Sequence, residues 1–160
     1  MPPSIVPTRY IGRPHGTRPP AYLAGPPSLP ADAARVVLIV DDDPFFRSLF
    51  KVLLAQTGLP VGTILEAEES RTAMTLSREH RVDVVFCDRN LTRYFSAQGI
   101  EVLTELRKVH PDLPIYMVSG DNTEEVVEEA RACGANGHIL KPVNLRTLRK
   151  VLTEALAAAR

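Results

Sequence analysis

The sequence predicts an α/β fold over residues 36–160, a (βα)5 doubly wound domain with a five-stranded parallel sheet. Three observations predict it. Short apolar runs alternate with segments whose apolar residues have helical spacing, helix start and stop signals lie between them, and polar residues collect where the runs end. Because helices that join parallel strands form right-handed crossovers, helices are expected on both faces of the sheet.

Five apolar runs have the length and composition of strands that are buried on both faces. In the first, every residue from Val36 to Val40 is β-branched or leucine, which is typical of a central strand in a parallel sheet. The predicted strands are 36–40, 62–66, 83–87, 114–118 and 137–140.

The segments between and after these strands have helical periodicity. Asp43 and Pro44 suit the start of the first helix, and Gly58 suits its end. Its apolar positions predict a buried face made of Phe46, Leu49, Phe50, Leu53 and Leu54. Asp121 and Glu124 have capping-box spacing ahead of the fourth helix. The predicted helices are 44–57, 69–80, 99–109, 122–133 and 144–158.

The first 35 residues differ in composition from the rest of the chain. Nine of the fourteen prolines lie in residues 1–30, and no helical or alternating pattern is present there. Four arginines and one aspartate give this segment a charge of about +3, whereas the remainder carries about −3. We expect a proline-rich, disordered N-terminal arm at 1–35 and one folded domain at 36–160.

Composition disfavours several classes of function. The folded part is mildly acidic, so nucleic acid is not an expected partner, and no apolar run approaches the 18 residues of a membrane helix. The N-terminus lacks the profile of a signal peptide. Cys87 and Cys133 fit neither a metal-binding spacing nor a disulfide framework, which indicates a reduced, cytoplasmic setting.

Chemically reactive side chains follow four of the five predicted strands. They are Asp41, Asp42 and Asp43 after the first, Asp88 after the third, Ser119 after the fourth and Lys141 after the fifth. Because the carboxyl ends of parallel strands lie at one edge of the sheet, these side chains are expected to converge. Two carboxylates about 4 Å apart repel by roughly 4 kcal/mol at an effective dielectric of about 20. A proton or a cation must therefore share the site, and Mg²⁺ is the hard cation that oxygen ligands hold.

Together these groups form a set that is suited to phosphoryl transfer. A carboxylate can accept a phosphoryl group covalently, and a divalent cation neutralises phosphate oxygens. A hydroxyl and a lysine each bind a further oxygen. Each residue alone has an ordinary explanation, such as a helix cap or a turn, but the combination at the ends of several strands does not.

The run from Val37 to Pro44, together with Asp88, Ser119 and Lys141-Pro142, resembles the receiver domain of bacterial two-component response regulators (CheY-like). The resemblance covers residues 36 to about 158 and implies a flavodoxin-like sheet of strand order 2-1-3-4-5. It implies that Asp88 is the phosphoacceptor.

The same resemblance implies roles for the neighbouring residues. Asp42 and Asp88 would bind Mg²⁺ directly, Asp41 would act through water, and the backbone carbonyl of Asn90 would complete the protein ligands. Ser119 and Lys141 would bind phosphoryl oxygens, and the Lys141–Pro142 peptide would be cis.

Two features depart from the family pattern. The resemblance implies that Ser119 and His138 are the two switch residues. At the position of His138 the family prefers tyrosine or phenylalanine. The loop from Asp88 to Gly99 is about three residues longer than usual and lacks the usual proline.

The leading hypothesis is a stand-alone response regulator and not an enzyme. A sensor histidine kinase or phosphotransfer protein would phosphorylate Asp88, and the face formed by 122–133, 137–140 and 144–158 would then bind a downstream protein. Because the chain ends just after the last predicted helix, no separate output domain is expected. A monomer or weak homodimer is expected.

Two alternatives stay open. A receiver fold that binds proteins without regulation by phosphorylation is favoured by the unusual 89–98 loop. Asp41 and Asp43 after a strand, with a later Ser119 and Lys141, also resemble phosphatases of the haloacid-dehalogenase type, in which Asp41 would be the nucleophile. Against that enzyme, Pro44 follows Asp43 and Asp88 would have no role.

Overall fold

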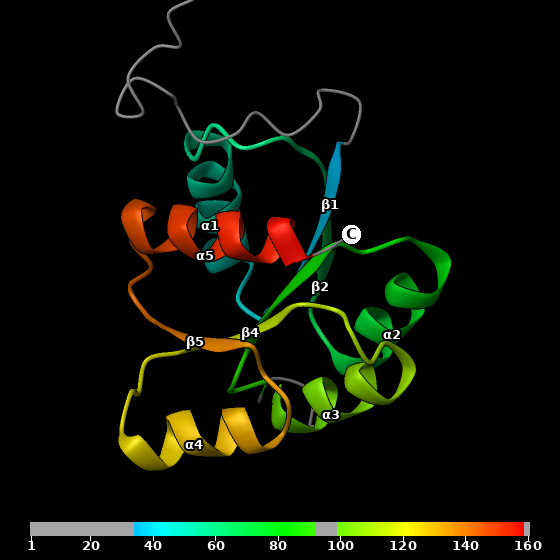
Figure 1. Ribbon diagram of the computed structural model, residues 1–160, viewed down its shortest axis with the longest axis vertical. Coiled ribbons are helices and arrows are strands. Elements are labelled where there is room, and N and C mark those ends of the chain that lie inside the picture. Colours follow the sequence, from blue (N-terminus) through cyan, green and yellow to red (C-terminus); the bar gives the residue numbers. More distant parts are fainter. Residues whose placement is uncertain (1–33, 92–98, 159–160) are drawn as a thin grey trace, which may run out of the picture. The chain divides into compact units, whose positions relative to one another are not determined.

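Five parallel strands form one sheet in the order β2-β1-β3-β4-β5 (Figure 1). The computed structural model describes residues 34–91 and 99–158. The strands are β1 Arg35–Val40, β2 Val61–Ala67, β3 Val84–Asp88, β4 Ile115–Ser119 and β5 Gly137–Leu140. The strand order and the flavodoxin-like fold class are confirmed.

Five helices connect and follow these strands. They are α1 Pro44–Gln56, α2 Ser70–Glu79, α3 Gly99–Val109, α4 Glu124–Ala132 and α5 Leu145–Ala158. Figure 1 shows α1 and α5 on one side of the sheet and the other three helices on the opposite side. Each predicted element is present, and its bounds differ from the prediction by at most two residues. Arg35, which the sequence assigned to the arm, begins β1, and residues 1–33 of that arm lie outside the described residues.

Strands β3 and β4 each begin and end one residue later than predicted. Asp88 is the last residue of β3, where it pairs with Val118, and Ser119 is the last residue of β4, where it pairs with Leu140. The backbone N–H of Lys141 donates to the carbonyl of Ser119 at 2.8 Å. Asp88, Ser119 and Lys141 are therefore held by ladder hydrogen bonds at one edge of the sheet.

The sheet is buried on both faces, as the continuous apolar strands predict. One face packs against α2, α3 and α4 through a core that includes Leu38, Val85 and Met117. On the other face, the rings of Phe50 and Phe86 lie 4.9 Å apart between their centres. This two-sided core fixes the strand ends that carry the reactive side chains.

Helix α1 begins as predicted but does not bury all of its predicted face. The Asp43 carboxylate accepts a hydrogen bond from the N–H of Phe45 at 2.9 Å, with Pro44 at the first helical position. Phe50 and Leu54 are buried, but the prediction that Leu49 is buried is wrong, since it is 45% exposed. An apolar stripe on a helix is wider than the strip that reaches the sheet.

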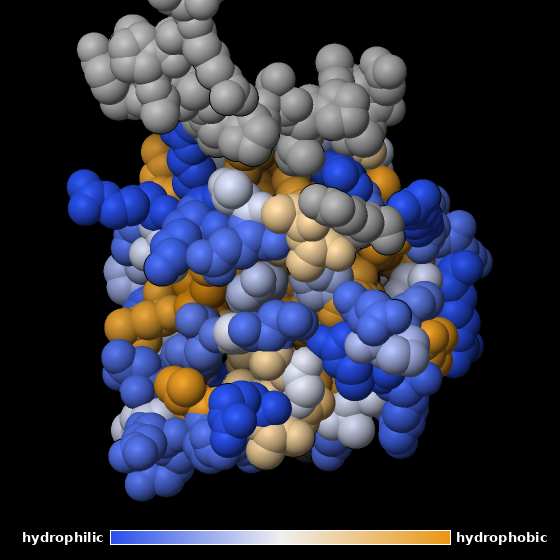
Figure 2. Space-filling model, viewed as in Figure 1, coloured by the Kyte–Doolittle hydropathy of each residue, from blue (hydrophilic) through white to orange (hydrophobic). Residues whose placement is uncertain are grey.

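On the face shown in Figure 2, hydrophobic residues lie in small groups between hydrophilic ones.

The ends of α4 differ partly from the prediction. Its N-cap residue is Thr123, not Asp121, so the predicted capping box is wrong. Asp121 instead accepts a hydrogen bond from the N–H of Thr123 at 2.9 Å, an Asx turn that leads into the helix. Gly134 follows the helix with φ of 97°, a conformation that favours glycine, as its predicted position at the end required.

Candidate functional site

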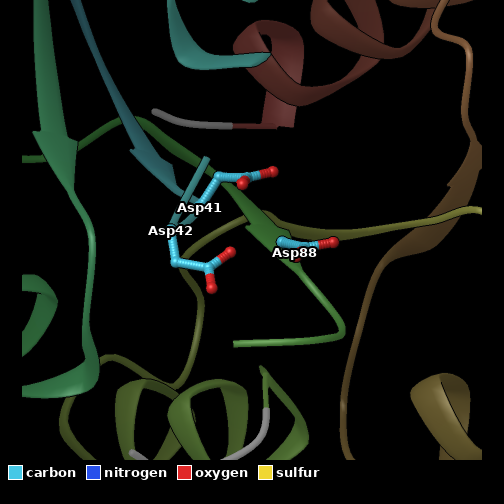
Figure 3. A group of neighbouring side chains, drawn as sticks. All are labelled: Asp41, Asp42 and Asp88. Atoms are coloured by element: carbon cyan, nitrogen blue, oxygen red, sulfur yellow. The ribbon is translucent and has the colours of Figure 1, made fainter. Parts of the chain in front are cut away.

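Three carboxylates meet at the carboxyl edge of the sheet. Asp41 and Asp42 follow β1 and Asp88 ends β3, and Figure 3 shows the three side chains next to one another. One oxygen from each lies within 4.8 Å of the others. Asp41 is 1% and Asp88 is 7% exposed, so two of the three charges lie in the protein interior.

Lys141 reaches these acids from the residue after β5. Its Nζ is 2.9 Å from Oδ2 of Asp41 and 3.1 Å from Oδ1 of Asp88. Burial opposes the charge on Lys141, but its hydrogen bond with Asp41 and the charges of Asp88 and Asp41 outweigh this and raise the pKa of the lysine. Lys141 therefore stays a cation and bridges carboxylates from two strands.

One lysine does not fully neutralise this cluster. Burial and the charge of Asp41 raise the pKa of Asp88 to about 6, although Lys141 and a hydrogen bond from the backbone of Asn90 act in the opposite direction. A substantial fraction of Asp88 is therefore protonated just below neutral pH. A second cation at this place would stabilise the ionised form that a nucleophilic carboxylate needs.

The donor set fits Mg²⁺. All the side-chain donors are carboxylate oxygens, which hard divalent cations prefer, and a divalent charge would offset the excess of acid over Lys141. Asp41, Asp42 and Asp88 are the residues that would hold the ion. Asn90 lies two residues beyond Asp88, and the predicted role of its carbonyl stays a prediction.

Ser119 and Gly99 complete the surroundings of Asp88. Ser119 is fully buried, and its hydroxyl accepts a hydrogen bond from the N–H of Asp121 at 3.0 Å. The first residue of α3, Gly99, approaches the backbone of Asp88 so closely that a Cβ there would collide with the Asp88 carbonyl. The described chain breaks off between Leu91 and Gly99, so residues 92–98 of the predicted longer loop lie outside the described residues.

His138 lies on β5, three residues before Lys141. It pairs with Met117 in the sheet and is partly buried. Its Nε2 is buried without a hydrogen-bond partner among the described residues. Burial lowers the pKa of His138, Asp121 raises it through a backbone hydrogen bond and its charge, and Arg89 lowers it. The predicted switch role of His138 stays a prediction.

Two residues of α1 at the site were not predicted from the sequence. The ring centre of Phe46 lies 4.0 Å from Nζ of Lys141. Arg47 donates from Nη1 to the backbone carbonyl of Asp41 at 2.6 Å and from Nε to Glu66 at 3.2 Å. Both follow the Asp43 cap by one helical turn, and that position is the only sequence signal that would have pointed to them.

These features define a class of protein: a parallel α/β domain with an acidic cation site and a bridging lysine where three strands end. Comparison of the chain with known protein families identifies this class. A family model for the response regulator receiver domain matches residues 37–153. The chain therefore belongs to the response regulator receiver family of two-component signalling.

Individual relatives agree. Over 118 residues, the chain is 32% identical to chemotaxis protein CheY-3 of Vibrio cholerae, which covers 72% of this chain and 87% of that protein. It is 34% identical over 120 residues to a cyclic di-GMP phosphodiesterase of Thermotoga maritima, covering 75% of this chain but only 30% of that longer protein. The crystal structure of the NtrX receiver domain from Brucella abortus superposes with a TM-score of 0.68 at 30% identity, covering 76% and 98% of the two chains.

Membership of the family supplies a general function. Receiver domains accept phosphoryl groups in signalling, bind Mg²⁺ at an acidic pocket, and interact with histidine kinases or phosphotransfer proteins and with downstream targets. Within residues 34–91 and 99–158, no helix has the length and apolar composition to cross a membrane.

Proposed function

We propose that this protein is a stand-alone response regulator that accepts a phosphoryl group on Asp88 in the presence of Mg²⁺. The observation that carries the proposal is the meeting of Asp41, Asp42 and Asp88 within 4.8 Å, with Nζ of Lys141 3.1 Å from Asp88. Asp88 pairs with the bridging lysine and, unlike Asp41 and Asp42, is itself the last residue of a central strand.

The residues divide the chemistry between them. A carboxylate oxygen of Asp88 forms a new bond to phosphorus. The bond between phosphorus and the histidine nitrogen of the phosphodonor breaks, and that nitrogen takes up a proton. Lys141 and the Ser119 hydroxyl bind the transferred oxygens. Mg²⁺, when bound, neutralises charge on the phosphoryl oxygens and orients them. Asp41 keeps Lys141 at the site through its 2.9 Å ion pair.

The signal would leave the site through the face made of α4, β5 and α5. Arg89 follows Asp88, and its guanidinium pairs with Glu129 on α4 at 2.8 Å. Lys141 joins β5 to the same acids. The exposed charged residues of α4 are mainly acidic and those of α5 mainly basic: Glu124, Glu125, Glu128 and Glu129 with Arg131, and Arg146, Arg149 and Lys150 with Glu154. A protein target with complementary charge is the expected partner.

The stand-alone role and the phosphodonor belong to the proposal. A sensor histidine kinase or phosphotransfer protein is the expected donor, as for the family. The match to CheY-3 extends over most of that protein, which supports a role that needs only a receiver domain.

Replacement of Asp88 by asparagine tests the proposal. Asp88→Asn removes the nucleophilic oxygen, so incubation with phosphoramidate and Mg²⁺ should add no phosphoryl group by intact-protein mass spectrometry, whereas the unmodified protein should gain one that hydroxylamine removes.

Asp43→Asn is the matched control. It makes the same chemical change next to the cluster but keeps the helix cap, since asparagine caps as well as aspartate. It should be labelled normally. Undiminished labelling of Asp88→Asn would overturn the assignment. If neither the unmodified protein nor Asp43→Asn is labelled, the result supports the alternative function, a protein-binding module that is not regulated by phosphorylation.

A further inference from the structure

The ammonium group of Lys141 has a third neighbour that is not an acid. Besides Asp41 and Asp88, it lies over the ring of Phe46, 4.0 Å from the ring centre. A cation within about 6 Å of an aromatic face is attracted by the ring, and the attraction is stronger where water is excluded. Lys141 is 25% exposed, so water reaches it on part of its surface only.

The Phe46 ring is itself fixed by the core. Its centre is 5.6 Å from that of Phe50, which is fully buried and packs in turn on Phe86 at 4.9 Å. The backbone of Phe46 is held in the first turn of α1, whose start is capped by Asp43. The ring is therefore a rigid platform that joins the acidic cluster to the interior.

A lysine at this place needs such a platform. Its four-carbon stem carries about 2 kcal/mol of rotamer entropy, and its ammonium is a point charge without the fixed fork of arginine. In the proposed reaction the ammonium must meet an oxygen of the incoming phosphoryl group next to Asp88. Any orientation in which it swings away from this point is unproductive.

We propose that Phe46 is a positioning residue for phosphoryl acceptance, whose ring face holds the Lys141 ammonium beside Asp88. This inference rests on the proposed function of Asp88 and adds a residue that touches neither the phosphoryl group nor the metal. Phe46 acts through Lys141.

Three variants separate positioning from packing. Phe46→Leu removes the aromatic face but keeps an apolar side chain, and Phe46→Tyr restores a ring. Phe50→Leu is the control for packing, because leucine keeps an apolar side chain in the buried position next to Phe46, while the ring under Lys141 stays in place. With phosphoramidate and Mg²⁺, Phe46→Leu should be phosphorylated about fivefold more slowly, which corresponds to roughly 1 kcal/mol. Phe46→Tyr and Phe50→Leu should remain within about twofold of the unmodified protein.

A second readout reports the position of Lys141 without any phosphorylation. Protons above an aromatic ring are shifted upfield, so the side-chain methylene protons of Lys141 should be upfield of those of other lysines in an NMR spectrum of lysine-labelled protein. The chain has four lysines, Lys51, Lys108, Lys141 and Lys150, and Lys141→Arg identifies the signal. The shift should persist in Phe46→Tyr and Phe50→Leu and disappear in Phe46→Leu.

The two readouts keep this inference distinct from the proposed function. If the unmodified protein accepts no phosphoryl group, the proposed function fails, and with it the role in phosphoryl acceptance, while the NMR shift still shows whether the ring holds Lys141. The positioning role is overturned if Phe46→Leu reacts at the normal rate, if Phe50→Leu is slowed equally, or if the Lys141 protons are not shifted by the ring.

Discussion

Asp88 combines burial with a like-charged neighbour, and its chemistry follows from that conflict. Burial and Asp41 raise its pKa to about 6, so this carboxyl binds a proton at a higher pH than an ordinary aspartate does. Asp43, by contrast, is exposed and serves as a helix cap, although it belongs to the same run of three aspartates. Position relative to the strand end, and not residue type, separates an acid at the site from a structural one.

His138 makes the stability of the protein depend on pH. Burial lowers its pKa below the ordinary value of 6.5, so between these two values the unfolded chain binds the proton more readily than the folded one. The folded state therefore loses stability as the pH falls through 6.5. His138→Phe removes this loss.

Urea unfolding at pH 7.5 and pH 5.5 measures this effect. The unmodified protein should lose more free energy of unfolding between the two pH values than His138→Phe does. The raised pKa of Asp88 favours the folded state as the pH falls, but Asp88 is present in both proteins and cancels in the comparison. An equal or larger loss in His138→Phe would contradict the prediction.

Sequence alone predicted the charged residues of the site better than their supports. Asp41, Asp42, Asp88 and Lys141 were expected together because each follows a strand, and parallel strands end at one edge. Phe46 was assigned to the apolar face of a helix, since its contact with Lys141 depends on how α1 packs beside the end of β5. Helical spacing does not contain that information.

At the scale of elements, one arginine joins three segments at the opposite end of the sheet. Arg107 on α3 donates to the carbonyls of His110, Pro111 and Gly134 and to the side chain of Asn136. Asn136 also accepts from the N–H of Ile115 at the start of β4. These hydrogen bonds of Arg107 and Asn136 connect the end of α3 to the loops before β4 and β5.

Arg107→Met should lower the free energy of unfolding by about 2–3 kcal/mol, because several carbonyls lose a charged donor at once. Arg131→Met is the matched control. Arg131 is largely exposed and pairs locally with Glu128, and an exposed ion pair of this kind contributes little to stability. Urea unfolding of both variants checks the contrast, and equal losses would show that Arg107 is no more than a surface residue.

The element boundaries show where local signals succeed. Asp43-Pro44 marked the start of α1 correctly because capping depends on adjacent residues only. The start of α4 was misplaced, because Asp121 forms an Asx turn with Thr123 instead of capping the helix, and both arrangements use the same residue types. Leu49 was misassigned because the width of the buried stripe depends on what packs against the helix.

At the scale of the whole molecule, the fold was predictable because strand composition, helix periodicity and turn residues all favour the same alternation. The order of strands required the resemblance to a family, since (βα)5 alone allows several orders. The two faces of the sheet contact the site through different residues. The α1–α5 side carries the aromatic cluster that reaches Lys141. The opposite side carries α4, which pairs through Glu129 with Arg89, the residue after β3.

The central claim is that Asp88 accepts the phosphoryl group, and chemical mapping of the adduct tests it most directly. Borohydride reduces an aspartyl phosphate to homoserine, so the protein treated with phosphoramidate and Mg²⁺, then reduced and digested, can be mapped by tandem mass spectrometry. Homoserine at position 88, dependent on Mg²⁺, is the predicted result. Homoserine at position 41 would indicate the phosphatase-type nucleophile instead, and homoserine at neither position would contradict phosphoryl acceptance by this site.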